Sequence, residues 1–291
     1  MSRTRRPGPS TRVRVHEVTA EPDAAPSVLR HEDRLATEEP LEIRLAWPGR
    51  PAQRVAVTMR TPGHDFELAT GFLVGEGVLA SAEDLRTVAY CTDTALTPEQ
   101  ELNVVTVELG VPPRTPPAER YAGLSAASSA CGVCGTESID DVLARCDVGA
   151  SDRWGGLRVS LEVLLALPDR LRAEQRVFDS TGGLHAAGLF DEHGTPAVVR
   201  EDVGRHNAVD KVVGARVLAG ASPAAPVLCV SGRIGFEIVQ KAVAAGVGLV
   251  AAIGAPSSLA VRLAEQAGLG LVGFLSERRF VVYAAPERVG G

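Results

Sequence analysis

Residues 227–252 read VLCVSGRIGFEIVQKAVAAGVGLVAA, and this stretch indicates the fold class. Two short apolar runs flank a segment whose apolar residues recur with the period of a helix. The same rhythm continues toward the C-terminus. Short apolar strands that alternate with amphipathic helices are typical of a largely parallel sheet with helices on its faces. We therefore predict an α/β fold with strands at 227–231, 249–253 and 270–275 and helices at 236–245 and 257–267.

The pattern extends upstream of this stretch. Two helical segments and two apolar runs precede it, and one further run follows it. The pair Gly182-Gly183 marks a tight turn or a close approach of the backbone, because two adjacent glycines are unsuited to the interior of a helix or strand. The predicted helices are 160–175 and 204–219, and the predicted strands are 186–190, 197–200 and an edge strand within 279–283.

The N-terminal half combines strands and helices differently. Apolar and polar residues alternate over 41–47 and 55–59, with a Pro-Gly turn between them, which predicts a β-hairpin. A helix follows Thr61, a second, short helix begins at Ser81, and a further strand covers 104–109.

Four prolines between residues 112 and 117 form the clearest linker in the chain. We therefore predict three regions: a disordered basic tail at 1–30, a smaller N-terminal α+β domain at 31–118, and the α/β domain at 119–291. The tail lacks periodicity, and no apolar segment follows its arginines, so no secretory signal is predicted. These arginines are Arg3, Arg5, Arg6, Arg12 and Arg14.

Charge and composition exclude several classes of protein. The chain has 291 residues and a net charge of -6, which argues against a general nucleic-acid binder. No apolar run approaches the roughly 20 residues that a membrane span needs. The odd number of cysteines, five, indicates a reducing cytoplasm rather than a disulfide framework. We expect Cys91, Cys146 and Cys229 to serve packing.

Cys131 and Cys134 are the candidates for chemistry. Glycines frame them, and residues 122–130 consist only of Ala, Gly, Ser and one Leu, which favours a mobile arm with reactive sulfur near its end. The spacing suits dithiol–disulfide cycling, a share in a zinc site, or a persulfide carrier. A helix is predicted from Ser138 through Cys146. No Lys, Arg or His flanks the pair, so a thiolate needs stabilisation from a distant segment or a partner.

The densest polar stretch, 200–211, lies where a predicted strand gives way to a helix. Ligands of open α/β sheets bind beyond the carboxyl ends of strands. Arg205, His206 and Asn207 fall in the first helical turn, whose free N–H groups favour an anion such as phosphate. Ser231-Gly232-Arg233 repeats this chemistry after the next strand. No Gly-x-Gly-x-x-Gly or Walker-type motif is present at such a junction, which disfavours ordinary dinucleotide or ATP binding.

Four motifs, taken in order, resemble the FdhD family, the sulfur-carrier proteins needed to activate formate dehydrogenases. The resemblance extends over roughly residues 35–284. The motifs are Cys131-Gly132-Val133-Cys134-Gly135, Thr181-Gly182-Gly183-Leu184-His185-Ala186-Ala187, the stretch 200–211, and Ser231-Gly232-Arg233 with Gln240-Lys241-Ala242.

The resemblance implies a sulfurtransferase that works through a cysteine persulfide. Such a protein receives sulfur from a cysteine desulfurase and passes it to the Mo-bis(molybdopterin guanine dinucleotide) cofactor, of molybdenum or tungsten, for formate dehydrogenase. The cofactor is a bound client, and no permanent cofactor or metal is expected. By this match Cys131 carries the persulfide and Cys134 assists or resolves it. The residues expected to bind the cofactor are His185, Arg205, His206, Asn207, Asp210, Lys211, Ser231 and Arg233.

The family resemblance also implies a fold and an assembly. The fold is a three-layer α/β/α core like that of cytidine deaminases, beside a smaller domain, and the protein is a cytoplasmic homodimer. Deaminases use a His-x-Glu motif and a Cys-x-x-Cys motif around zinc. Here Ala187 stands where the catalytic glutamate belongs, so deamination is disfavoured.

A C-terminal segment associated with cofactor binding in the family departs from the family pattern here. Ser276 and Val281 stand where the family often carries an arginine and an asparagine, and Arg278 or Arg279 would compensate. By the resemblance, the residues of this segment that are expected to bind the cofactor are Phe274, Leu275, Ser276, Glu277, Arg278 and Arg279.

Two other functions stay open on the residues alone. A Cys-x-x-Cys dithiol oxidoreductase needs a lowered thiol pKa, for which the sequence offers no local cause. A zinc-stabilised chaperone of the molybdenum cofactor needs a second ligand pair at zinc spacing, which the sequence lacks.

Overall fold

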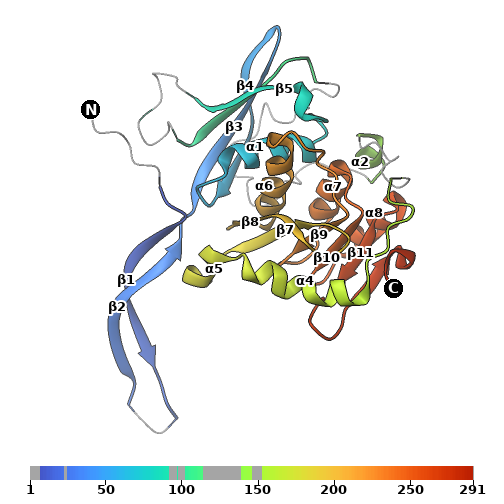
Figure 1. Cartoon of the computed structure of the whole chain (residues 1–291). Coiled ribbons are helices and arrows are strands. Elements are labelled where there is room, and N and C mark those ends of the chain that lie inside the picture. Colours follow the sequence, from blue (N-terminus) through green and yellow to red (C-terminus); the bar gives the residue numbers. More distant parts are fainter. Residues whose placement is uncertain are drawn as a thin grey trace.

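The structure is a computed structural model of the chain, and it describes residues 7–22, 25–91, 97, 102–113, 139–145 and 153–290. Figure 1 shows a body built of two sheets and several helices, from which a long β-hairpin extends. The boundary predicted at residue 118 and the Cys131–Cys134 pair both lie outside the described residues.

The larger sheet has six strands in the order β12-β11-β10-β9-β7-β8. Strands β9, β10 and β11 are parallel because helices connect them, whereas the short turn between β7 and β8 makes that pair antiparallel. Since β7 and β12 also run antiparallel to their neighbours, the sheet is mixed rather than largely parallel. The strands are β7 (His185–Phe190), β8 (Pro196–Asp202), β9 (Val227–Val230), β10 (Leu249–Ala252), β11 (Gly270–Gly273) and β12 (Val281–Ala284).

Helices cover both faces of this sheet, because successive strand residues point to opposite sides. Leu228 packs in the cluster that holds α6, α7 and α8, whereas Cys229 packs with α4 on the other face. The α/β class is therefore confirmed, while the likeness to cytidine deaminases stays a prediction. The helices are α4 (Leu161–Ala173), α6 (Arg205–Leu218), α7 (Phe236–Ala245) and α8 (Ser258–Ala267).

Helix α5 (Arg176–Thr181) was not predicted, and its cause is tertiary. The N–H groups of Val177 and Phe178 donate to the carboxylate of Glu201 on β8, at 2.9 and 2.7 Å. A side chain from another element thus satisfies the free N–H groups of the first turn. Helix α2 (Ile139–Arg145) agrees with the helix predicted after Ser138.

The smaller sheet has the order β4-β3-β6-β5 and packs on helix α1 (Asp65–Gly75). Gly49, with φ +83°, forms the turn of the predicted β3–β4 hairpin. Ile43 of this sheet, Leu68 of α1 and Val212 of α6 belong to one hydrophobic cluster, so the two halves of the chain share a core. The elements are β3 (Glu39–Trp47), β4 (Arg50–Arg60), the 3₁₀ helix Ala82–Asp84, β5 (Leu85–Tyr90) and β6 (Val104–Leu109). A second 3₁₀ helix, Pro286–Arg288, follows β12 of the larger sheet.

Helices α1 and α6 cross with their backbones in contact. A Cβ atom at Gly71 would lie 1.8 Å from the carbonyl oxygen of Asp210, and one at Gly214 would lie 1.8 Å from that of Glu67. Only glycine fits at both positions, because the clashing atoms belong to the opposing backbone.

We expect Gly214→Ala to lower the free energy of unfolding by about 1–3 kcal/mol or more, since the two helices must move apart. Chemical denaturation measures this loss. Gly156→Ala is the matched control, because a Cβ atom at Gly156 meets nothing within 4 Å. Equal stability of the two variants would show that the helices do not cross this closely.

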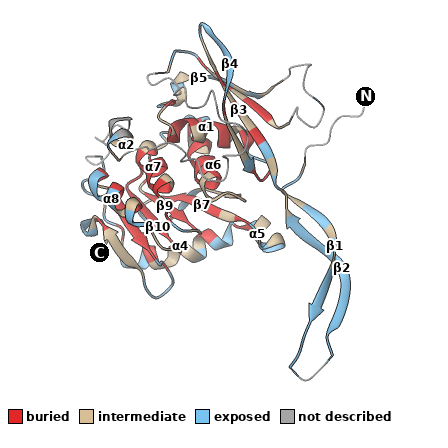
Figure 2. Cartoon of the chain, turned by 180° about the vertical axis from the view of Figure 1, so that it is seen from behind, coloured by how far each residue is buried: buried red, intermediate tan, exposed pale blue. Residues whose placement is uncertain are grey.

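The prediction of a disordered tail at 1–30 is wrong over much of its length. Strands β1 (Ser10–Thr19) and β2 (Ser27–Ala36) pair antiparallel as a long hairpin. The alternation Arg12-Val13-Arg14-Val15 is a strand pattern, which the basic composition of the tail obscured. Most of the hairpin is solvent-exposed, as Figure 2 shows.

Candidate functional site

Three loops meet at the carboxyl ends of the parallel strands. Gly254 N donates to Gly232 O at 3.2 Å, Phe274 N donates to Gly254 O at 3.1 Å, and Ile234 N donates to Ala255 O at 3.0 Å. The loops that follow β9, β10 and β11 are thus joined side by side. This edge is where open α/β sheets bind ligands.

Glycines bring the polar residues of this edge together. A Cβ atom at Gly254 would lie 2.7 Å from the carbonyl oxygen of Gly232. A Cβ atom at Gly232 would lie 3.4 Å from His185 Nδ1 and 3.6 Å from Arg205 Cδ. The loop after β9 therefore runs beside His185, at the start of β7, and Arg205, at the start of α6. Two residues predicted from distant motifs are neighbours in space.

Burial and nearby positive charges favour the neutral form of the His185 imidazole. Partial burial lowers the pKa of His185, and the nearby positive charges of Arg205 and His206 lower it further. A neutral imidazole can accept a proton or donate a hydrogen bond at neutral pH. Among the described residues the buried Nε atom of Arg205 has no hydrogen-bond partner.

His206 has a partner that the sequence analysis missed. Its Nε2 lies 3.0 Å from Oε2 of Glu237, in the first turn of α7. This hydrogen bond is the main cause that lowers the pKa of Glu237. The pair joins the N-termini of α6 and α7 at the edge of the site. Only the position of Glu237 just after Ser231-Gly232-Arg233 hinted at this role.

Ser231 and Arg233 differ in what they do. The Ser231 hydroxyl accepts a hydrogen bond from Ala186 N at 2.9 Å, and Ser231 N donates to Ala186 O at 2.9 Å. Ser231 therefore ties the end of β9 to β7. Arg233 is exposed to solvent, so its guanidinium group is accessible from solution.

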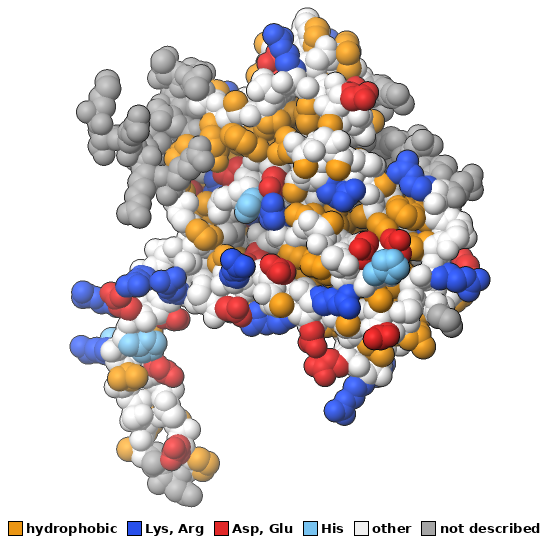
Figure 3. Space-filling model, in the orientation of Figure 1, with side chains coloured by type: hydrophobic (Ala, Val, Ile, Leu, Met, Phe, Trp, Pro, Cys, Tyr) orange, Lys and Arg blue, Asp and Glu red, His pale blue; other side chains and the backbone are white. Residues whose placement is uncertain are grey.

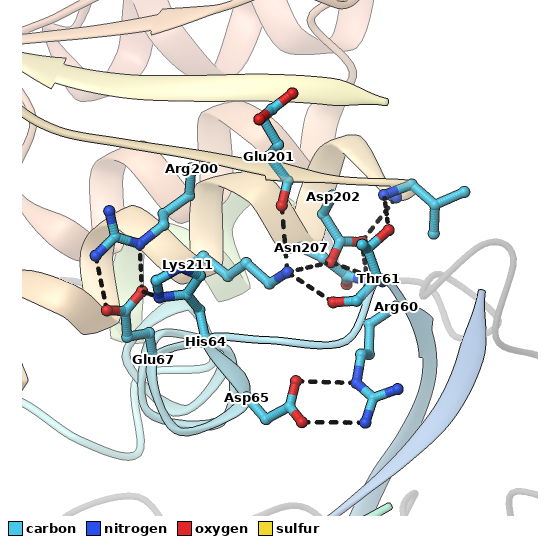
Figure 4. Close-up of polar contacts among 12 residues, drawn as sticks. Arg60, Thr61, His64, Asp65, Glu67, Arg200, Glu201, Asp202, Asn207 and Lys211 are labelled. Atoms are coloured by element: carbon cyan, nitrogen blue, oxygen red, sulfur yellow. Dashed lines mark hydrogen bonds and ion pairs between the residues drawn. The ribbon is translucent and has the colours of Figure 1, made fainter. Parts of the chain in front are cut away.

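Lys211 and Asn207 lie in a buried network that joins the two halves of the chain (Figure 4). Lys211 Nζ lies 2.6 Å from Asp202 Oδ2 and donates to the carbonyl oxygens of Thr61 at 3.0 Å and Glu201 at 3.2 Å. Three partners use its three protons, so Lys211 has none left for a ligand. We assign Lys211 to holding the β4–α1 turn against β8.

Asn207 and Asp202 extend the same network. Asn207 Nδ2 donates to Met59 O at 2.7 Å and to Asp202 Oδ1 at 3.0 Å. Asp202 Oδ1 also accepts from Gly204 N at 2.8 Å, which fixes the backbone just before Arg205. Asp202 and Thr61 were not among the predicted residues, and the bond between them, Thr61 N to Asp202 Oδ2 at 3.1 Å, spans 141 positions of the sequence.

Asp210 belongs to a second buried pair. Lys241 Nζ donates to both carboxylate oxygens of Asp210, at 2.7 and 2.9 Å, and lies 5.4 Å from the centre of the Phe72 ring. Burial by itself would lower the pKa of Lys241, but the carboxylates of Asp210 and Glu76 outweigh it and raise that pKa. Burial raises the pKa of Asp210 to about 6, which is still below neutral pH. The pair is therefore ionised at neutral pH and joins α6, α7 and α1.

Glu67 of α1 forms an ion pair with Arg200 of β8 that joins the two halves of the chain, also drawn in Figure 4. Arg200 donates to its two carboxylate oxygens at 2.6 and 2.8 Å, and His64 Nδ1 lies 3.1 Å from it. Burial alone would raise the pKa of Glu67, but these hydrogen bonds outweigh it and lower the pKa to about 2.

Because folding lowers this pKa from 4.5, ionised Glu67 adds stability above pH 4.5 and loses it as the pH falls toward 2. We expect Glu67→Gln to reduce the unfolding free energy at pH 7 and to match the wild type near pH 2. Thermal melts between pH 2 and 7 measure this difference. Glu265→Gln, on the exposed face of α8, is the control. A difference that does not change with pH would contradict this assignment.

The C-terminal segment forms the turn between β11 and β12. Phe274, with φ +51°, is exposed beside Gly254, whereas Leu275 is buried. Ser276 Oγ donates to Arg279 O at 3.1 Å and accepts from Arg279 N at 3.3 Å, which closes the turn. Glu277, Arg278 and Arg279 are exposed. Phe274 therefore adjoins the three-loop edge directly.

Cys131 and Cys134 lie outside the described residues, as does Cys146. Of the remaining cysteines, Cys229 is fully buried, as predicted, and burial raises its pKa to about 12.

Among the described residues no group of three or more His, Cys, Asp or Glu side chains could hold a metal ion. No helix in the described ranges has the length and apolarity to cross a membrane.

Comparison with known proteins identifies the family. Residues 36–290 match the model of the FdhD/NarQ family. The chain belongs to the FdhD/NarQ family. It is 51% identical over 263 residues to the sulfur carrier protein FdhD of Streptomyces coelicolor, which covers 88% of this chain and 89% of that protein. The family resemblance read from the four motifs is thereby confirmed.

Other proteins are similar to this chain over most of its length. The sulfur carrier protein FdhD of Mycobacterium tuberculosis is 46% identical over 276 residues, covering 91% of this chain and 95% of that protein. The crystal structure of a putative formate dehydrogenase accessory protein from Desulfotalea psychrophila aligns with a TM-score of 0.66 at 23% identity, covering 96% of this chain and 99% of that chain. This structural match supports the fold.

Proposed function

We propose that this FdhD/NarQ protein is a sulfur carrier for formate dehydrogenase. It takes sulfur from a cysteine desulfurase and passes it to the Mo-bis(molybdopterin guanine dinucleotide) cofactor. The observation that carries this proposal is the identity of about half of its residues, over nearly nine-tenths of both chains, to proteins named sulfur carrier protein FdhD. A cytoplasmic homodimer with a cytidine-deaminase-like core is part of the same proposal.

The first half-reaction is a sulfur exchange at Cys131. Its thiolate attacks the outer sulfur of the desulfurase persulfide, a new S–S bond forms, and the S–S bond of the donor breaks. The desulfurase cysteine leaves as a thiolate, so no oxidant or reductant is consumed. In this proposal Cys134 assists or resolves the Cys131 persulfide. The cofactor is the substrate of the second half-reaction.

The three-loop edge supports the cofactor part of the proposal. The guanine dinucleotide ends of the cofactor carry phosphates, and helix N-termini with nearby cations favour anions. Arg205 has a buried Nε without a partner among the described residues, and exposed Arg233 follows the next strand. Neutral His185 can hydrogen-bond a phosphate or a base edge without adding charge. Phe274 offers an exposed ring beside Gly254.

The buried residues support this edge rather than contact the ligand. Asp202 and Asn207 hold the backbone ahead of Arg205, and Asp210 with Lys241 fixes α6 against α7. We therefore assign ligand contacts to His185, Arg205, His206, Arg233 and the 274–279 turn. Asn207, Asp210 and Lys211 position these residues, and Ser231 does so through its bond to Ala186.

A deletion experiment tests the proposed function. Formate dehydrogenase purified from cells without this protein should contain molybdenum or tungsten in normal amount, yet oxidise no formate. Reintroducing the gene should restore activity. Full activity in the deletion strain would contradict the proposal.

A binding experiment tests the site. Guanosine diphosphate serves as the probe, and calorimetry gives its affinity for the full chain. Arg205→Ala should weaken binding about 10-fold or more, the value of one or two charge-assisted hydrogen bonds. Arg262→Ala, exposed on α8, should leave the affinity unchanged. Equal effects of the two substitutions would remove Arg205 from the site.

A further inference from the structure

We propose that the β1–β2 hairpin is a docking arm that binds a second copy of this chain, with its arginine-rich face against the acidic body of that copy. The inference deepens the homodimer part of the proposed function, and its test measures association alone. It therefore fails or succeeds independently of sulfur transfer.

The arm needs a partner because it has little hydrophobic core of its own. Its ten residue pairs make it about 33 Å long. Val18, Val28 and Leu29 are 62%, 61% and 61% exposed. A two-stranded hairpin is marginally stable in water unless something packs on it. Figure 1 shows the arm directed away from the body of its own chain.

The register divides the arm into two unlike faces, because directly paired residues share a face. Arg12 pairs with Arg34, Arg14 with Glu32, His16 with Arg30 and Val18 with Val28, so one face carries four arginines, a single carboxylate and one apolar pair. We call this the basic face. The opposite face carries the apolar side chains Val13, Val15, Leu29 and Leu35 together with Glu17, His31 and Asp33.

The basic face is unfavourable in an isolated chain. Arg12 and Arg34 are opposite one another, and like charges in this position destabilise a strand pair. Arg12 forms an ion pair with Glu32 at 3.6 Å, and the side chains of both residues are largely exposed. An exposed pair of this kind contributes little. Carboxylates from another molecule would relieve the repulsion.

A second copy of this chain supplies those carboxylates. Residues 1–36 contain seven Lys and Arg against five Asp and Glu, whereas residues 37–291 contain 23 against 31. The body therefore carries a net charge of -8, and the arm region carries +2. Two whole chains repel one another, but contact between the arm of one and the body of the other is attractive. Exchange of arms about a two-fold axis covers both arms at once. Figure 3 shows charged side chains of both signs on the body and on the arm.

The experiment compares two charge-reversed variants of the full chain. Arg12→Glu with Arg34→Glu reverses the basic face, and Arg50→Glu with Arg262→Glu makes the same charge change at exposed sites on the body. Light scattering over a concentration series gives the dimer dissociation constant. We expect a wild-type dimer, at least a 10-fold weaker dimer for the arm variant, and a smaller effect for the body variant. Raising salt should weaken the wild-type dimer.

A cross-link locates the contact. A photoreactive amino acid at position 16, in a mixture of ¹⁴N- and ¹⁵N-labelled chains, should give mixed-isotope cross-links between the arm and residues 37–290. Circular dichroism checks that each variant is folded. A monomeric wild type, an arm variant that dimerises like the wild type, or cross-links confined to single chains would each overturn the proposal.

Discussion

Replacing Cys131 with alanine should leave formate dehydrogenase assembled but inactive. In the proposed mechanism the substitution removes the sulfur atom that accepts sulfur from the desulfurase. Loss of a nucleophile costs far more than loss of a binding contact, so activity should fall at least about 100-fold. Formate oxidation by enzyme from cells that carry the variant gene measures the effect.

The matched control is Cys229→Ala, which also removes one thiol. Cys229 is fully buried in β9 and burial raises its pKa to about 12, so its thiol is not reactive. This variant should retain activity, with a small loss of stability from the missing sulfur. Normal formate oxidation with Cys131→Ala would remove Cys131 from the mechanism.

Lys211→Met should be the most destabilising substitution in the network of Figure 4. It leaves Asp202, which is 0% exposed, as a buried carboxylate without its cation. Removing one partner of a buried pair costs about 3–5 kcal/mol. Denaturant unfolding of the wild type and the variant measures the loss.

A double variant and an exposed pair make this test specific. Adding Asp202→Asn to Lys211→Met removes the unpaired charge and should restore part of the stability. Arg86→Met breaks an exposed pair with Glu108 and should cost less than about 1 kcal/mol. If Lys211→Met costs no more than Arg86→Met, the buried network does not hold the two halves together.

Local patterns in the sequence were sufficient for much of the fold. The helix predicted at 236–245 and the strand at 104–109 agree with α7 and β6, because their apolar periods are regular and their ends carry turn residues. Strand direction was harder to predict. The alternation of strands and helices suggested a largely parallel sheet, whereas β7 runs antiparallel to both β8 and β9. Helix α5 and the β1–β2 arm were missed because a distant carboxylate and a strand partner stabilise them.

The candidate site was predictable only in its individual residues. Single motifs indicated His185 and Arg205, but no local pattern shows that both residues lie beside Gly232. Lys211 was expected to bind the cofactor because of the family resemblance, yet Asp202 and Thr61 are its partners. Polar residue type alone does not distinguish a ligand contact from a buried structural pair.

Sulfur transfer itself is tested most directly by peptide mass spectrometry. The purified chain is incubated with a cysteine desulfurase and cysteine, then digested without reductant. A mass increase of about 32 Da, the mass of one sulfur atom, should appear on the peptide that contains Cys131 and disappear after reduction. Absence of added sulfur on that peptide, while the desulfurase itself carries a persulfide, would contradict the sulfur-carrier account.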